Sequence, residues 1–104
     1  IYNPDHLFNN AVHVNNLAEF INSLLHIDLK QHFDYINVAC TGGLQIRRIV
    51  ENIITTIGAT SKINIGSTIK IPFTISNQYA VEKYAFKPID FATALNSYLH
   101  ETLD

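Results

Sequence analysis

The 104-residue sequence lacks methionine and tryptophan and contains one cysteine, four glycines and three prolines. Because Cys40 has no partner within the chain, an internal disulfide framework is excluded, and we expect a reducing, cytoplasmic location. The absence of methionine and the start at Ile1 lead us to expect a fragment or a processed chain. No apolar run approaches the roughly 20 residues that a membrane-spanning helix requires, and no signal peptide is recognisable.

Charge is also scarce, since charged residues make up 15% of the chain and the net charge is −2. Domains that bind nucleic acid by neutralising phosphates carry an excess of basic residues, so we expect no nucleic-acid partner. Hydrophobic residues make up 47%, which excludes a disordered tail and allows one domain with a small core. Fifteen isoleucines and eleven asparagines predict an AT-rich coding sequence of the kind found in many low-GC bacteria.

Hydrophobic periodicity predicts helices, three with apolar residues at i, i+3, i+4 and i+7 and one shorter and weaker. The three periodic helices cover residues 17–25, 46–57 and 91–103, and the shorter, weaker one covers residues 77–84. Asn15 and Asn16 are the expected N-caps of the first helix, and Asp90 that of the last. Gly58 is expected to end the second helix in the left-handed conformation.

Short segments rich in β-branched and aromatic residues predict three strands, at 33–39, 62–65 and 69–75, with a turn at Gly66-Ser67. Because two amphipathic helices flank the strand at 33–39, we expect it to lie in a parallel sheet that is covered on both faces. The chain offers too few parallel partners for such a sheet. We therefore predict that residues 1–104 form a single α/β domain fragment at the edge of a larger protein.

Tyr79 and Lys83 have the Tyr-x-x-x-Lys spacing of short-chain dehydrogenases, in which the lysine lowers the pKa of the phenol for acid–base work. The simpler interpretation, which we favour, is a surface helix with Tyr79 packed inward and Lys83 solvated. The five histidines have no i, i+4 pairing, so no metal is predicted. Thr41-Gly42-Gly43 lacks the further residues of a phosphate-binding loop and is expected to be a turn. Cys40 is expected to be a small buried side chain.

Five segments carry a resemblance to extended short-chain dehydrogenases, the NAD-dependent epimerase/dehydratase family. Residues 8–18 (FNNAVHVNNLA) resemble the family's His-Val-x-Asp-Leu-Ala segment, in which a helix begins. Residues 35–39 resemble its Tyr-Asn-Ile-Gly strand, and residues 45–58 the helix after it. Residues 76–88 are similar to its Asp-x-Ser-Lys-Ala and Leu-Gly-Trp-x-Pro motifs, with Ala85 at the glycine. Residues 91–103 resemble its C-terminal helix.

The resemblance implies that the chain is the C-terminal, substrate-binding part of such an enzyme. The N-terminal Rossmann half, with the NAD or NADP loop and the catalytic tyrosine and lysine, is not in this sequence. Tyr79 and Lys83 fall on a later segment, so no catalytic, cofactor or metal residue is predicted here and the chain alone is expected to be inactive. The whole enzyme would be an oxidoreductase or isomerase acting on a sugar, commonly a nucleotide sugar.

Three residues are the candidate substrate contacts that follow from the resemblance: Asn9, Asn10 and Lys70. Asn9 stands where the family has an arginine that often contacts the substrate diphosphate, and an amide cannot supply that charged bidentate contact. Lys70 is the candidate for a later phosphate-binding arginine. Surface or capping roles are equally compatible with all three. The alternative function is a non-enzymatic binding or oligomerisation module, and a homodimer is compatible with both interpretations.

Overall fold

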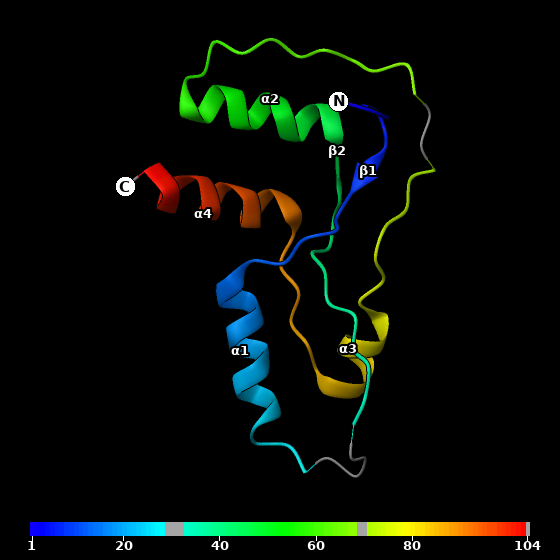
Figure 1. The fold of residues 1–104 in the computed structure, drawn as a ribbon. Helices are drawn as coiled ribbons and strands as arrows, with labels where there is room; N and C mark the ends of the chain where they lie inside the picture. Colours follow the sequence, from blue (N-terminus) through cyan, green and yellow to red (C-terminus); the bar gives the residue numbers. More distant parts are fainter. Residues whose placement is uncertain (29–32, 69–70, 104) are drawn as a thin grey trace.

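The computed structural model describes residues 1–28, 33–68 and 71–103. Figure 1 shows how the elements of this part are arranged. In chain order they are β1 (Leu7–Phe8), α1 (Val14–Leu24), β2 (Leu44–Gln45), α2 (Ile46–Ile57), α3 (Gln78–Tyr84) and α4 (Phe91–Leu103). Helices are therefore present at all four predicted places.

The ends of the helices confirm two of the predicted caps and correct the third. Asp90 Oδ1 accepts the main-chain N–H of Thr93 at 2.8 Å, and Gly58 adopts the left-handed conformation, with φ 68°. The expectation that Asn15 and Asn16 cap α1 is wrong, because the helix already begins at Val14. The cap is His13, whose Nδ1 accepts the main-chain N–H of Asn15 at 3.1 Å.

The strand predictions are wrong within the described residues. Residues 33–39 and 62–65 belong to no strand, nor do residues 71–75, and residues 69–70 lie outside the described part. The sheet that is described pairs β1 with β2, antiparallel, with Leu7 opposite Gln45. A strand needs a paired main chain, and composition indicates a preference for that conformation without supplying the partner. Gly66 is not in a turn, and its N–H donates to the carbonyl of Ile1 at 2.7 Å.

The core consists of two separate hydrophobic clusters. The lower cluster joins α1, α3 and the segment before residue 40, and its buried members are Phe20, Ala80, Tyr84 and Phe86. The upper cluster joins α2, α4 and the small sheet, and its buried members are Cys40, Phe91 and Ala94. Figure 1 shows the two groups of helices one above the other, with the chain passing between them. A hydrogen bond from Asn9 to Cys40 and a bridge between Thr41 and Asp90 join three segments of the chain, and we call this place the crossing.

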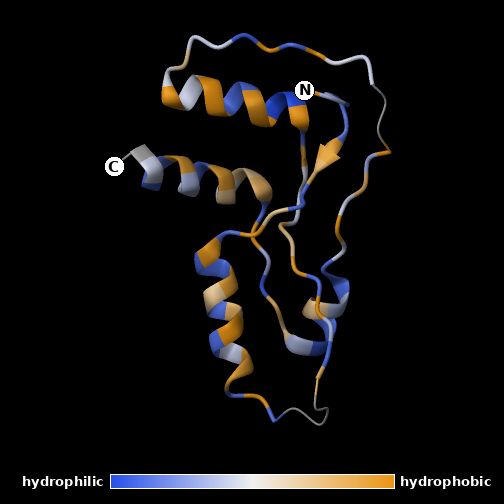
Figure 2. Cartoon of the chain, in the orientation of Figure 1, coloured by the Kyte–Doolittle hydropathy of each residue, from blue (hydrophilic) through white to orange (hydrophobic). Residues whose placement is uncertain are grey.

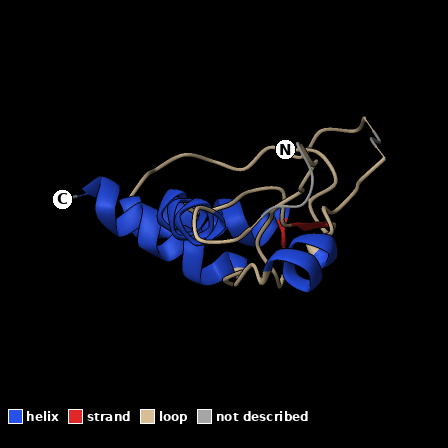
Figure 3. Ribbon diagram, turned by 90° about the horizontal axis from the view of Figure 1, so that it is seen from below, coloured by secondary structure: helices blue, strands red, loops and turns tan. Residues whose placement is uncertain are grey.

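The molecule is thin and open. Its radius of gyration is 16.3 Å and its extents are 51 × 36 × 18 Å, whereas a compact chain of about 100 residues has a radius of about 13 Å. The view in Figure 3 shows this thinness. Figure 2 shows apolar residues along the helices and in the long loops alike. Val14, Ile21 and Leu25 of the α1 region are 68%, 50% and 76% exposed, and no residue of α2 is buried.

Candidate functional site

Asn9, the first predicted substrate contact, lies at the crossing between the two clusters and is 9% exposed. Its Nδ2 donates to the carbonyl oxygens of Cys40 at 3.0 Å and of Ile75 at 2.8 Å. Its Oδ1 accepts the main-chain N–H of Ile75 at 2.9 Å. Both N–H bonds of the amide are thus used, so Asn9 can donate to a ligand only by giving up a contact that holds the fold.

The other two predicted contacts are placed differently. Asn10 is partly buried, and its Oδ1 is buried without a hydrogen-bond partner among the described residues. Lys70 lies outside the described residues. The structure therefore brings Asn9 and Asn10 to the same crossing and leaves the place of the lysine open.

Further contacts join distant parts of the chain. Asn77 Nδ2 donates to the carbonyl of Ala39 at 3.0 Å, and Asn16 Nδ2 donates to the carbonyl of Lys87 at 2.9 Å. Thr41 and Asp90 form a parallel bridge. Side-chain amides thus hold together main-chain segments that are 38 to 71 residues apart.

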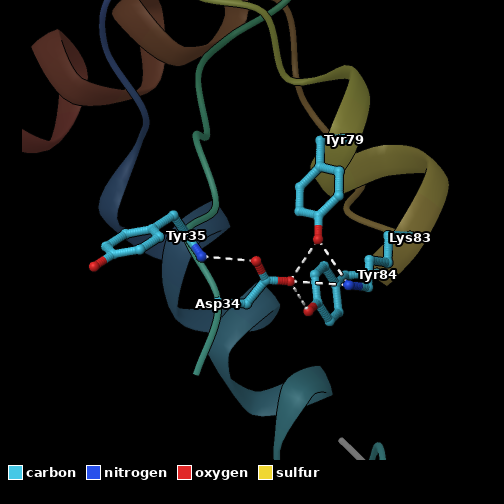
Figure 4. Close-up of polar contacts among 5 residues, drawn as sticks. All are labelled: Asp34, Tyr35, Tyr79, Lys83 and Tyr84. Atoms are coloured by element: carbon cyan, nitrogen blue, oxygen red, sulfur yellow. Dashed lines mark hydrogen bonds and ion pairs between the residues drawn. The ribbon is translucent and has the colours of Figure 1, made fainter. Parts of the chain in front are cut away.

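Asp34 forms a second polar site, shown in Figure 4, where its carboxylate faces α3. Asp34 Oδ2 accepts from Tyr79 Oη at 2.5 Å and from Lys83 Nζ at 3.1 Å, and it also accepts from the hydroxyl of Tyr84. Lys83 Nζ also lies 2.7 Å from Tyr79 Oη. The prediction that Tyr79 packs inward is wrong, because Tyr79 is 45% exposed. Lys83 is exposed, as predicted, but its ammonium also binds Asp34.

The charges of this cluster follow from its hydrogen bonds. The hydroxyl groups of Tyr79 and Tyr84, with the ammonium of Lys83, hold the pKa of the Asp34 carboxyl well below its usual range. Contacts with Tyr79 and Asp34 raise the pKa of Lys83, and the bond to Asp34 raises the pKa of Tyr84. At neutral pH a carboxylate and an ammonium therefore face each other.

The chemistry of the cluster is that of a structural clamp. A tyrosine that acts as an acid or base must exchange its proton with a substrate, but the hydroxyl of Tyr79 already donates to Asp34. The cluster ties the segment before residue 40 to α3. Sequence reasoning found Tyr79 and Lys83 through their i, i+4 spacing, and it missed Asp34, which is 45 residues from Tyr79 and carried no local signal.

Two hollows lie beside α1. The larger, of about 320 Å³, lies between the start of α1 and α4, and its lining includes His13, Phe91 and Tyr98. The smaller, of about 200 Å³, lies between α1 and residues 85–87. The side chain of His13 is 6% exposed, and its Nε2 is 3.4 Å from a carboxylate oxygen of Glu101.

Cys40 and Gly42, the two other residues considered in the sequence, have structural roles. Cys40 is buried, as predicted, and burial raises the pKa of its thiol. Gly42 has φ 58°, which fits the predicted turn. The described residues contain no group of three or more histidine, cysteine, aspartate or glutamate side chains that could hold a metal ion. Within the same residues, no helix has the length and apolar character needed to cross a membrane.

No family model, curated protein or solved structure matches this chain. Its function is therefore inferred from its own residues and contacts.

Proposed function

We propose that this chain is the C-terminal, substrate-binding part of an NAD(P)-dependent sugar epimerase, dehydratase or reductase. The whole enzyme would be a cytoplasmic, bacterial α/β protein of the extended short-chain dehydrogenase family, and its substrate a sugar or nucleotide sugar. The part described here would bind and orient the substrate. The sequence contains no glycine-rich dinucleotide loop, so we assign NAD or NADP, and the hydride transfer that it performs, to an upstream half.

The observation that carries this proposal is that side-chain amides join the resembling segments to one another. Asn9, in the first segment, binds the main chain at Cys40 and at Ile75, which adjoin the second and the fourth. Asn16 binds the main chain at Lys87. Motifs that lie far apart in the sequence thus form one structural unit, as expected if they were inherited together from one fold.

The backbone at Ala85 supports the same assignment independently. The resemblance places the family's glycine at this position, and Ala85 ends α3 in the left-handed conformation with φ 56°. This conformation favours glycine, because a Cβ atom crowds the following carbonyl. The position therefore has the geometry that the family's glycine would serve.

The open shape supports the need for an upstream half. The accessible surface is 7646 Å², whereas a compact chain of 11.7 kDa exposes about 5,900 Å². The excess of roughly 1,700 Å² compares with about 800 Å² that each partner of a stable complex buries. Exposed apolar side chains on α1, such as Val14 and Ile21, are the type of surface that another part of the same enzyme would cover.

Within this proposal the two asparagines have different tasks. Asn9 fixes the crossing through its three main-chain bonds and so positions its neighbour. Asn10 has an amide that is not committed in this way, so we assign it the contact with a sugar hydroxyl or a phosphate oxygen. Lys70 would supply positive charge for a diphosphate. None of these three residues carries out the redox chemistry.

The first test is the reading frame upstream of Ile1. We expect it to encode a glycine-rich strand–helix unit followed by a Tyr-x-x-x-Lys pair, and a start codon directly before Ile1 would contradict the proposal.

The second test is NMR titration of the 104-residue chain with UDP-glucose. We expect shifts in the amides of residues 9–10, no shifts with NAD, and no turnover with both present.

A matched pair of variants localises the substrate contact. Asn10→Ala should weaken the binding of UDP-glucose about tenfold, the loss expected for one polar contact to a ligand. Asn22→Ala, which changes an exposed asparagine of α1, should leave it unchanged. Equal binding by both variants would remove Asn10 from the site.

The same exposed apolar surface favours a second candidate function, a non-enzymatic binding or oligomerisation module. It predicts an upstream frame without a dinucleotide unit and no response to UDP-glucose. The reading-frame test therefore separates the two functions.

A further inference from the structure

His13 lies between α1 and α4, and its two ring nitrogens make different contacts. Nδ1 accepts the main-chain N–H of Asn15 at 3.1 Å and so caps α1. Nε2 lies 3.4 Å from a carboxylate oxygen of Glu101, near the end of α4. The side chain of His13 is 6% exposed and that of Glu101 is 54% exposed. One nearly buried ring thus joins the start of one helix to the end of another.

The capping bond determines where the neutral ring of His13 holds its proton. Because a main-chain N–H donates to Nδ1, that nitrogen carries no proton, and the proton is on Nε2. The Nε2 atom makes no hydrogen bond among the described residues, so Glu101 is close to it without being aligned to accept. Histidine is the side chain that ordinarily changes its charge between pH 5 and 8. The added proton would go to Nδ1, the atom that caps α1.

Protonation of His13 changes both contacts in opposite directions. Both ring nitrogens then act as donors, so Nδ1 can no longer accept the N–H of Asn15. The positive charge also faces the positive end of the α1 dipole, whereas the carboxylate of Glu101 and the negative end of α4 attract it. The contact with α1 is therefore lost while the contact with α4 becomes an ion pair.

The other titratable groups that face His13 come from α4 and from the crossing. Tyr98 of α4 lines the same hollow as His13, and the thiol of Cys40 faces the main-chain N–H of His13. Phenols and thiols are ordinarily neutral between pH 5 and 7. The carboxylate of Asp90, which also acts on that thiol, is bound at the start of α4. Among the described residues, Glu101 is thus the charged side chain that responds to the ring.

We infer that His13 is a pH-dependent switch between α1 and α4. The neutral ring holds the first turn of α1, and the protonated ring releases that turn and binds Glu101. Val14, the first residue of α1, lines the hollow of about 320 Å³ together with His13, so the release loosens one wall of this hollow. The switch goes beyond the proposed function and is independent of it, since it requires neither substrate nor cofactor.

The test is NMR of the 104-residue chain at about pH 8 and about pH 5.5, above the range in which carboxyl groups ordinarily gain protons. At the higher pH we expect the ring nitrogen shifts of His13 to show an unprotonated Nδ1 and a protonated Nε2. At the lower pH the protection of the Asn15 amide against hydrogen exchange, relative to an unfolded chain, should be about fivefold lower, which corresponds to the loss of one cap. The amide of Phe20, buried in the middle of α1, should keep its protection.

Two results on the wild type alone would overturn the inference. One is a protonated Nδ1 in the ring of His13 at the higher pH. The other is a protection of the Asn15 amide that is equal at the two pH values. Neither result depends on a variant, so the inference stays testable if a substitution at His13 prevents folding.

His13→Asn is the matched control. Asparagine is among the best helix caps, and its amide does not gain a proton in this range of pH. The Asn15 amide of a folded His13→Asn, verified by circular dichroism, should be equally protected at both pH values. A loss of protection in acid that persisted in this variant would assign the change to another group and overturn the inference.

Glu101→Gln tests the contact with α4. The side chain of Glu101 is 54% exposed, so the substitution should leave the fold intact. Without the carboxylate the protonated ring loses its partner, and the release of the Asn15 amide should need a lower pH than in the wild type. A release with the same pH dependence in both proteins would overturn the pairing with Glu101 that the switch requires.

Discussion

Asn9→Ala should lower the free energy of unfolding by about 3 kcal/mol. Asn9 makes three hydrogen bonds, to the carbonyl groups of Cys40 and Ile75 and from the N–H of Ile75. Each such bond contributes about 1 kcal/mol net, and groups left buried without a partner cost at least as much. Because small domains have total stabilities of only about 5–15 kcal/mol, the loss would be a large share of the whole.

Urea denaturation followed by circular dichroism measures this loss. With a slope of about 1–3 kcal/mol per molar urea, the midpoint should fall by about 1–3 M. The control is Asn10→Ala. Because Asn10 Oδ1 is buried without a partner among the described residues, its removal should change stability by less than about 0.5 kcal/mol. A change equally small in Asn9→Ala would refute the structural role of Asn9. If Asn9→Ala also lost UDP-glucose binding, the side chain of Asn9 would be assigned to substrate contact instead.

Two further predictions concern α3 and the cluster around Asp34. Ala85→Gly should raise the free energy of unfolding by roughly 0.5–1 kcal/mol, since the left-handed conformation costs an alanine about 1–2 kcal/mol and the greater freedom of glycine in the unfolded chain offsets part of it; a lower Tm would contradict this. Because the pKa of Asp34 is lowered in the folded chain, its contribution to stability is present at neutral pH and is lost as the pH falls below about 4, the ordinary value. Asp34→Asn should therefore be less stable than the wild type at pH 7 and lose less stability on acidification, and parallel pH profiles for the two proteins would count against the clamp.

The helices were predictable because their signals are local. In α2 the apolar spacing of residues 46–57 and the glycine at position 58 specify the length and the end of the helix within one stretch of sequence. The end of α4 nearest Asp90 is specified in the same way, by a side chain three residues from the N–H that it accepts.

The strand at 33–39 and the candidate site depend on contacts that are not local. The β-branched and aromatic residues of 33–39 indicate a preference for extended backbone, but the neighbour that would make it a strand is not in the described part. Asn9 reaches Ile75 across 66 residues. No spacing in the sequence encodes such a contact, so the resemblance suggested a ligand where the structure has main-chain bonds.

The spacing of Tyr79 and Lys83 illustrates both cases. A separation of four residues on a helix correctly places their polar ends together, 2.7 Å apart. The group that determines their chemistry, the carboxylate of Asp34, comes from a segment 49 residues from Lys83. The spacing thus allowed a contact that the favoured interpretation rejected, and it could not indicate the role of the pair.

The division of the core into two clusters has a consequence for how substitutions combine. Phe20 and Phe86 belong to the lower cluster, and Phe91 and Ala94 to the upper one. Effects on stability add when residues share no partners and lie more than about 7–10 Å apart. Substitutions in different clusters should therefore act independently, and each cluster can change in evolution without a compensating change in the other. The exception is the crossing, where Asn9 bonds to the main chain of Cys40, in the upper cluster, and of Ile75, before α3. Double substitutions that include Asn9 should depart from the sum of the single ones.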